Sequence, residues 1–353
     1  MTTENKFGAD SSSRENGLGT DQPAPPRRWR RPVLWLWLLL VLPAGLIGAH
    51  AVLWYLACAQ ITAQMTVELR NLARQGWSTF ADTPVRSGYP WVAEVTVPGL
   101  RAAGPLIGWE TERLVVRLAM LRPTEVRLTA EGGQSLRLGD SPIFHYSAAR
   151  AEAVVSLTRP DRIAVEIDEL AGSPIAASRV RLMIDRAAMT ATADARDVTL
   201  PANLQLPLGP TVAQIGVDVA LFGGGLADVT APALTIWRDA GGRVEVPRVA
   251  LEWGAVKFIG QTQIALDAKL QPELTGKLQL GGYQALIDAL VSAGTLRPGP
   301  AQSLGAVLGL LAHPSDATGP NSVEMPFTMR DRGLAVGRIP LLRAPEIAWP
   351  AGK

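Results

Sequence analysis

An uncharged run of 24 residues, from Val33 to Leu56, constrains this 353-residue chain more than any other feature of its sequence. A helix of that length reaches about 36 Å, whereas the hydrocarbon core of a bilayer is about 30 Å thick, so the run is predicted to span a membrane. The first charge after the run is Glu68, and four arginines precede it: Arg27, Arg28, Arg30 and Arg31. This excess of positive charge on one side predicts a cytoplasmic N-terminus, with the rest of the chain on the other side of the membrane.

The run is predicted to remain in the mature protein as a signal anchor. It is longer than the apolar region of a cleaved signal peptide, and it ends in bulky residues where a cleavage site needs small ones. Cys58 is a weak lipoprotein site, because Tyr55 stands where an aliphatic residue is required. Aromatic residues are predicted to lie at both membrane interfaces: Trp29, Trp35 and Trp37 at one, and Trp54 and Tyr55 at the other.

The segments on either side of the run differ in character. Residues 1–32 are rich in small and polar residues, and they are predicted to form a disordered cytoplasmic tail. Apolar residues at helical spacing follow the run and predict a stalk helix that ends near Gly76, inside a stalk and linker of residues 57–85. Residues 86–353 are then expected to form the main domain.

Composition excludes several classes of function. Hydrophobic residues make up 47% of the chain and charged residues 19%, which excludes wholesale disorder. After residue 32 the basic and acidic residues are equal in number, so we expect no nucleic-acid partner. With three His and one Cys in the chain, we also expect no metal and no cofactor.

Alternation of apolar and polar residues indicates half-buried strands between Trp91 and Leu280. Four segments show it clearly: 126–130, 163–167, 180–184 and 264–270. Gly132-Gly133 and Gly241-Gly242 are predicted to form hairpin turns between strands, and a last hairpin is predicted around Asp331-Arg332-Gly333. The strands should therefore form an antiparallel meander.

Helical spacing of apolar residues returns near the C-terminus, over 283–291 and again over 304–311. These two amphipathic helices are too short to span a membrane and are expected to cover an open face or end of the sheet. The predicted fold is α+β and mainly β. It consists of an N-terminal transmembrane helix, a large antiparallel and curved sheet, and these two C-terminal helices.

Two short motifs carry a resemblance to a known family. The step Gly88-Tyr89-Pro90-Trp91 leads into the first strand, and Gly337-Arg338-Ile339-Pro340-Leu341 lies near the C-terminus. Together they resemble the family called domain of unknown function 2125, although Trp91 stands where Phe is commoner. The resemblance implies a Gram-negative inner-membrane protein with no assigned activity and no catalytic residues to transfer. It also implies distant similarity to AsmA-like periplasmic β proteins, which are implicated in lipid traffic and envelope upkeep.

Residues that could support catalysis have simpler structural interpretations. His145 and His313 lack neighbouring residues at the spacing of a zinc site or a catalytic triad. Glu166 and Asp168 alternate with apolar residues, which favours the solvent side of a strand over a glycosidase pair. Gly223-Gly224-Gly225 lacks the lysine and the following helix of a phosphate-binding loop.

The remaining candidate is the apolar lining of the sheet. A sheet that curls without closing would form a groove able to hold acyl chains, and the alternative is an ordinary packed core. The residues assigned to a lipid or partner groove are Trp253, Ile264, Leu266, Leu270, Leu286 and Leu308. We expect a non-enzymatic periplasmic protein of envelope maintenance that binds or passes phospholipid or glycolipid, or holds an envelope protein. The alternatives are a periplasmic hydrolase with a site not visible in the sequence and a purely structural scaffold.

Overall fold

The computed structural model describes residues 31–104, 107–139, 141–173, 175–201, 206–224, 229–337 and 339–351. The predicted tail of residues 1–32 lies almost entirely outside the described residues. The chain divides into a unit of residues 1–49, whose described part is helical, and a unit of residues 50–353 that holds the whole sheet. As predicted, the structure is mainly β, with a long apolar helix at its N-terminal end.

The helices are α1 (Arg31–Arg74), α2 (Ala231–Asp239), α3 (Tyr283–Ser292) and α4 (Pro298–Leu311). The first nine strands are β1 (Ser78–Phe80), β2 (Val85–Ser87), β3 (Val92–Ala103), β4 (Ile107–Ala119), β5 (Glu125–Leu138), β6 (Phe144–Ser147), β7 (Arg150–Ser156), β8 (Arg159–Ser173) and β9 (Ala177–Asp185). The others are β10 (Thr190–Thr199), β11 (Thr211–Phe222), β12 (Arg243–Trp253), β13 (Val256–Leu266), β14 (Pro272–Gly281), β15 (His313–Ser315), β16 (Gly319–Arg330), β17 (Gly333–Val336) and β18 (Ile339–Arg343).

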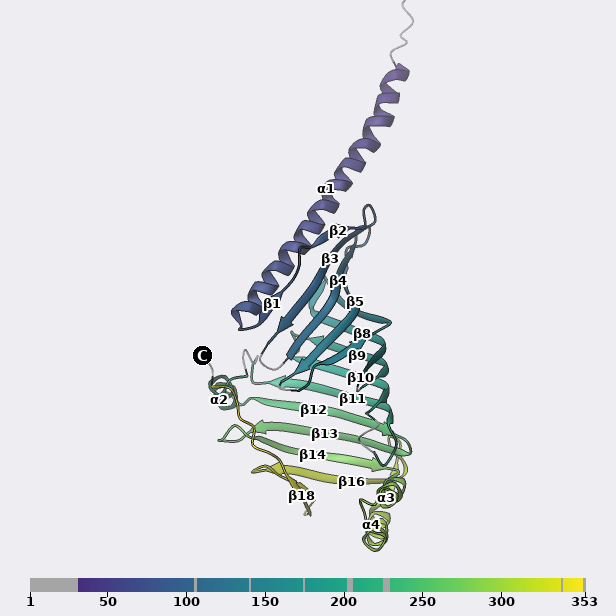
Figure 1. Cartoon of the computed structure of the whole chain (residues 1–353), viewed down its shortest axis with the longest axis vertical. Helices are drawn as coiled ribbons and strands as arrows, with labels where there is room; N and C mark the ends of the chain where they lie inside the picture. The colour runs from purple at the N-terminus through teal and green to yellow at the C-terminus, as the bar shows by residue number, and fades with distance from the viewer. Residues whose placement is uncertain are drawn as a thin grey trace, which may run out of the picture. The chain divides into compact units, whose positions relative to one another are not determined.

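The strands form one antiparallel meander, as predicted. β3, β4 and β5 pair in sequence, both β6 and β7 join β5 to β8, and pairing then runs in chain order from β8 to β14. β14 pairs with β16, which leads to β17 and β18, while β1 and β2 both pair with β3. In Figure 1 β3 to β5 are inclined to β11 to β14, because each strand is twisted relative to its neighbour.

Helix α1 continues without a break through the boundary predicted at residues 56–57. It ends at Arg74, and Gly76 follows with a φ of +87°, the left-handed conformation that stops a helix. Its later part is not a free stalk. Trp54, Ile61 and Met65 pack against the buried residues of β3 and β4, so residues 57–74 belong to the sheet domain. Trp54, predicted at a membrane interface, also packs against the sheet domain.

Three local predictions were wrong. Gly132 and Gly133 lie inside β5, where one extra residue opposite Glu112 makes a bulge rather than a hairpin turn. Gly241 and Gly242 end α2 rather than joining two strands, since their N–H groups bond to the carbonyls of Arg238 and Trp237. The hairpin at Asp331-Arg332 is confirmed, with both residues at positive φ between β16 and β17.

The third wrong prediction concerns the end of β13. This strand ends at Leu266, and the Asp267 carboxylate then accepts hydrogen bonds from the backbone N–H groups of Lys269 and Gln271. Leu270 lies in the resulting turn at a φ of +58°. A side chain that hydrogen-bonds its own backbone overrides the apolar alternation that suggested a longer strand.

Buried residues gather in three separate clusters instead of one core. The first lies between α1 and β3 to β4, the second joins α3 and α4 to β16, and the third contains Ala177, Val198 and Val212. The side chains that are almost fully buried are small: Val95, Val97, Val212, Val323, Cys58 and Ser322. Much of the apolar surface of the described sheet therefore lies outside a sealed core.

Candidate functional site

One face of the sheet is mainly apolar from β3 to β16. Because directly paired residues in antiparallel strands point to the same side, the pairing registers identify rows of side chains that cross the sheet. From β3 to β16 one row contains twelve residues in twelve strands: Val95, Val116, Leu128, Ala153, Val165, Leu182, Ala193, Val217, Val249, Gly260, Leu278 and Met325. We call it the central row. It contains no polar side chain. On β2 the register pairs Val95 with Arg86, which lies beyond this row.

A second row runs beside the central row, and each of its members lies two positions away from the central-row residue of the same strand. It consists of Ala151, Ile167, Val180, Ala195, Ile215, Leu251, Phe258, Leu280 and Val323. We call the surface formed by both rows the apolar face. Neighbouring strands are about 4.8 Å apart, so eleven steps along the central row span about 53 Å. This length exceeds the thickness of a bilayer's hydrocarbon core.

Burial along the central row is highest where α1 covers it. Val95 and Val116 lie under α1 and are 0% and 3% exposed, and Met325 packs against the α3 and α4 cluster. From Leu128 to Val249 every member of the row is only half-buried. Helix α1 thus seals one end of the apolar face, while α3 and α4 cover part of the other end, where Leu278 and Met325 stay half-buried. The middle stays accessible to solvent or to another apolar molecule.

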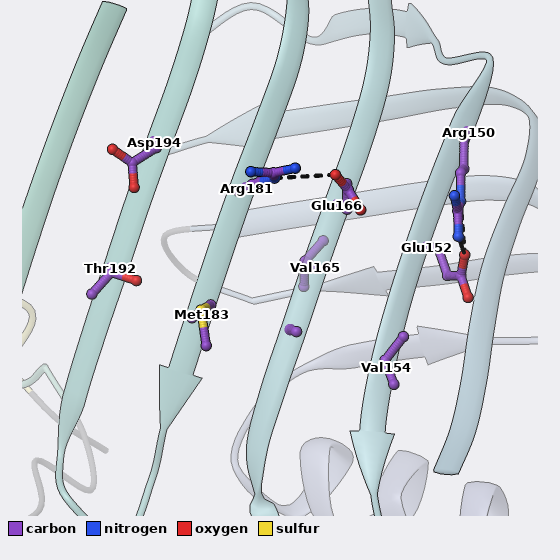
Figure 2. A pocket seen from close by; sticks show the side chains of 10 residues that line it. Arg150, Glu152, Val154, Val165, Glu166, Arg181, Met183, Thr192 and Asp194 are labelled. Carbon is purple, nitrogen blue, oxygen red and sulfur yellow. Dashed lines mark hydrogen bonds and ion pairs between the residues drawn. The ribbon is translucent and has the colours of Figure 1, made fainter.

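The opposite face carries charges arranged as cross-strand ion pairs. A shallow hollow of about 510 Å³ lies on this face. Figure 2 shows two ion pairs that line it, Arg150 with Glu152 within β7 and Arg181 with Glu166 across β9 and β8. The distance from Arg181 Nε to Glu166 Oε1 is 3.1 Å. Arg248 similarly joins Asp194 and Asp218 across three strands. Such pairs suit a solvated outer face.

Glu166 and Asp168, the possible glycosidase pair, both lie on this charged face of β8. Arg179 contacts both carboxylates, with Nε 3.6 Å from Glu166 Oε1 and 2.7 Å from Asp168 Oδ1. Arg181 adds a second contact to Glu166. Carboxylates neutralised by arginines on a neighbouring strand fit the solvent-side interpretation of the sequence.

His145 lies in a hollow of about 740 Å³ with Asp82, Glu110 and Glu112. On the sheet Ser135 pairs with both His145 and Glu110, so serine stands between the carboxylate and the histidine. A catalytic triad needs histidine in the middle, where it contacts both other groups. No hydrogen bond joins His145 to a carboxylate in the described part of the chain.

Other possible reactive groups are dispersed. His313 is exposed at the start of β15, and its Nδ1 lies 3.4 Å from the carbonyl oxygen of Leu311. Within the described ranges, no three side chains of the metal-binding types come together. Gly223 and Gly224 follow β11, while Gly225 falls outside the described residues. Helix α2 follows this loop, although the sequence had suggested no helix there.

The predicted groove residues fall into two groups. Trp253, Ile264 and Leu266 lie outside the two rows but on the same side of the sheet. Trp253 pairs with Val256 and also donates from Nε1 to the Gly209 carbonyl. Leu308 packs in the cluster that covers part of the β16 end of the apolar face, and Leu286 is half-buried on α3. Leu270 does not belong with them, because it lies in the turn after β13.

The sequence interpretation missed a docking row on α1. His50, Trp54 and Cys58 recur every four residues, and each directs a polar atom to a backbone carbonyl beside or within β3. Their acceptors are Pro90, Val92 and Glu94, two residues apart. Four helical residues rise about 6 Å and two strand residues about 6.6 Å, so the two repeats match. The sequence signal that could have revealed this row is the recurrence of a residue with a polar atom every four positions near the end of an apolar run.

The predicted family motif precedes β3. Gly88 has a φ of +88° and its carbonyl accepts the N–H of Val92. The ring of Tyr89 lies against Trp54, with their centroids 5.6 Å apart, and Trp91 is 66% exposed. The motif thus forms the turn that receives α1.

Comparison with known proteins agrees with this motif. The family model described as uncharacterized protein conserved in bacteria (DUF2125) matches residues 54–345, most of the chain. No curated protein and no solved structure matches the chain significantly.

Proposed function

The chain belongs to the uncharacterised bacterial family DUF2125, and we propose that its sheet binds acyl chains of lipids on the apolar face. The observation that carries the proposal is the central row, in which half-buried apolar side chains continue from Leu128 to Val249. Leaving such a surface in water is costly, at about 25 cal/mol for each Å² of apolar area. A lipid tail would cover it without needing specific polar contacts.

The length of the row favours lipid over a small apolar ligand. The central row spans about 53 Å, which can hold more than one acyl chain end to end or let one chain move along it. Helix α1 is the one helix in the described residues that is long and apolar enough to cross a membrane. Anchoring in a bilayer would place the apolar face close to a source of lipid.

Location and role follow from this proposal. We place the N-terminus in the cytoplasm because of its four arginines, and the sheet domain in the periplasm, where it would bind or pass phospholipid or glycolipid during envelope maintenance. The similarity to AsmA-like proteins belongs to the same proposal. A reporter that is active only in the periplasm should be active when fused after Lys353. A fusion that is stably made but inactive would contradict the proposed orientation.

The enzyme alternative has weaker support. The hollow at His145 gathers carboxylates, but the order of Glu110, Ser135 and His145 along the paired strands does not suit a triad. A structural scaffold or a protein partner would leave the apolar face without lipid, which makes these alternatives distinguishable by experiment.

Photocrosslinking from single positions of the full chain in growing cells tests the proposal. A crosslinker at Leu182 lies on the apolar face and one at Ile264 on the same side of the sheet, while Met183 and Gln263 lie next to these positions on the opposite face. Mass spectrometry of the adducts should find phospholipid or glycolipid at Leu182 and Ile264 only.

Met183 is the stringent control, because its apolar side chain is 59% exposed and would capture lipid if exposure alone were responsible. Adducts with protein alone, or equal lipid capture on both faces, would overturn the lipid proposal. Protein adducts confined to the apolar face would instead support the partner-binding scaffold.

A further inference from the structure

A line of exposed apolar side chains lies at one end of the strands, next to the start of the sheet domain. Trp91, Leu121 and Leu157 are 66%, 74% and 48% exposed and lie in three successive turns. The turns touch one another, since Met120 N–H donates to the Trp91 carbonyl and Leu157 N–H donates to the Thr124 carbonyl. We call these turns, together with the adjacent turn at Arg186, the turn edge.

The charge of the turn edge differs from that of the sheet faces. Arginines on the charged face are held in ion pairs, such as Arg117 with Glu94 and Arg162 with Asp185. Arg122, Arg159 and Arg186 lie in the turn edge, are exposed, and make no ion pair with the described residues. Asp161 is the acidic residue without an ion pair there, so the edge carries a positive excess.

The turn edge is tied to the last part of the uncharged run of α1. His50 Nε2 lies 2.7 Å from the Pro90 carbonyl oxygen, one residue before Trp91. A carbonyl can only accept, so His50 donates this hydrogen bond. His50 lies within the predicted membrane span, six residues before its end at Leu56.

We infer that the turn edge rests on the surface of an anionic phospholipid bilayer, with Trp91, Leu121 and Leu157 among the headgroups and the three arginines on lipid phosphates. Trp is enriched at this depth because its ring is apolar and its N–H is polar. Basic residues near an anionic surface are attracted to it electrostatically. The inference requires α1 to be inserted, but it does not depend on lipid occupying the apolar face.

The test uses the full chain reconstituted in vesicles of phosphatidylethanolamine and phosphatidylglycerol. Trp91→Cys, Leu121→Cys and Leu157→Cys are each labelled with a small fluorophore, and lipids brominated on their acyl chains serve as quenchers. Labels on the turn edge should lose most of their emission. Unmodified protein, in which Cys58 is buried, measures background labelling.

Leu310→Cys is the matched control, because Leu310 is an equally apolar residue, 88% exposed on α4. Its label should keep its emission. Equal quenching at Leu310 and at the three turn-edge positions, or no quenching at any of them, would overturn the inference.

A second measurement tests the arginines separately. Arg122→Gln, Arg159→Gln and Arg186→Gln combined should reduce quenching at Leu121 in anionic vesicles, and should have little effect in phosphatidylcholine vesicles. A variant that behaves like the parent in both vesicles would overturn the role given to the arginines. Lipid crosslinking at Leu182 tests the proposed function, and its outcome does not depend on the outcome of either quenching measurement.

Discussion

Glu94 shows at the scale of one residue how the charged face is held together. Ser87 Oγ donates to Glu94 Oε1 at 2.6 Å, and Arg117 Nε donates to Glu94 Oε2 at 2.7 Å, so one carboxylate links β2, β3 and β4. These two hydrogen bonds, first from Ser87 and then from Arg117, hold the pKa of Glu94 below its ordinary value. The carboxylate is therefore more stable in the folded protein than in the unfolded chain.

This linkage predicts a pH dependence of stability. A lowered folded pKa contributes stability that is fully present above the ordinary value of 4.5 and is lost as the pH falls through the folded pKa. The urea midpoint of the parent should therefore fall on acidification, and Glu94→Gln should remove part of that fall. At neutral pH the variant should lose about 1 to 3 kcal/mol of unfolding free energy.

Glu110→Gln is the control for this prediction. Its side chain is 55% exposed and lies 3.8 Å from Arg101, so losing the pair should change stability by less than about 1 kcal/mol. If the two variants had the same acid sensitivity, the role assigned to Glu94 would be wrong.

Trp54 tests the docking row of α1. Trp54→Phe keeps the aromatic packing on Tyr89 but removes the donor to the Val92 carbonyl, which is 2.8 Å away. We expect a loss of about 1 kcal/mol in the unfolding free energy of the full chain in detergent. Tyr55→Phe, at a 55% exposed neighbour outside the row, should change it by only a few tenths. Equal effects would mean that the row does not fix α1.

At the scale of elements, α2 depends on a close approach between its last turn and the chain that follows. A Cβ on Gly242 would collide with the ring and the carbonyl of Trp237, which is 7% exposed. Gly242→Ala should therefore displace α2 and cost about 1 to 3 kcal/mol, measured as a lower midpoint of thermal unfolding.

Gly309 provides the matched control within α4. A Cβ there meets only the Tyr283 hydroxyl at 3.6 Å, an ordinary contact, and alanine favours helix over glycine by up to about 1 kcal/mol. Gly309→Ala should leave the midpoint unchanged or raise it. A Gly242→Ala variant as stable as the parent would show that the contact with Trp237 is readily relieved.

At the scale of the whole molecule, burial changes along the central row. The same substitution should therefore cost different amounts of unfolding free energy at different positions of the row. Val95→Ala removes two methyl groups at a side chain that is 0% exposed and should cost about 2 kcal/mol. Val165→Ala removes the same groups at a half-buried position and should cost about half as much. Urea unfolding of both full-length variants in lipid-free detergent measures this difference.

The same pair of variants separates an open face from a closed core. A cost at Val165 equal to that at Val95 would indicate that the middle of the row is sealed in solution. A smaller cost at Val165 would agree with an accessible apolar face, on which the proposed lipid binding depends.

The sequence by itself determined the elements whose signals are local. The uncharged run predicted α1, period-two alternation predicted strands such as β5, β8 and β9, and helical spacing predicted α3 and α4. It could not determine that Gly132-Gly133 is a bulge or that Leu270 leaves the strand, because both depend on hydrogen bonds between specific partners. Only the tertiary structure aligned alternate residues of twelve strands into the central row and left its middle half-buried, since register and coverage arise from contacts between residues far apart in the chain.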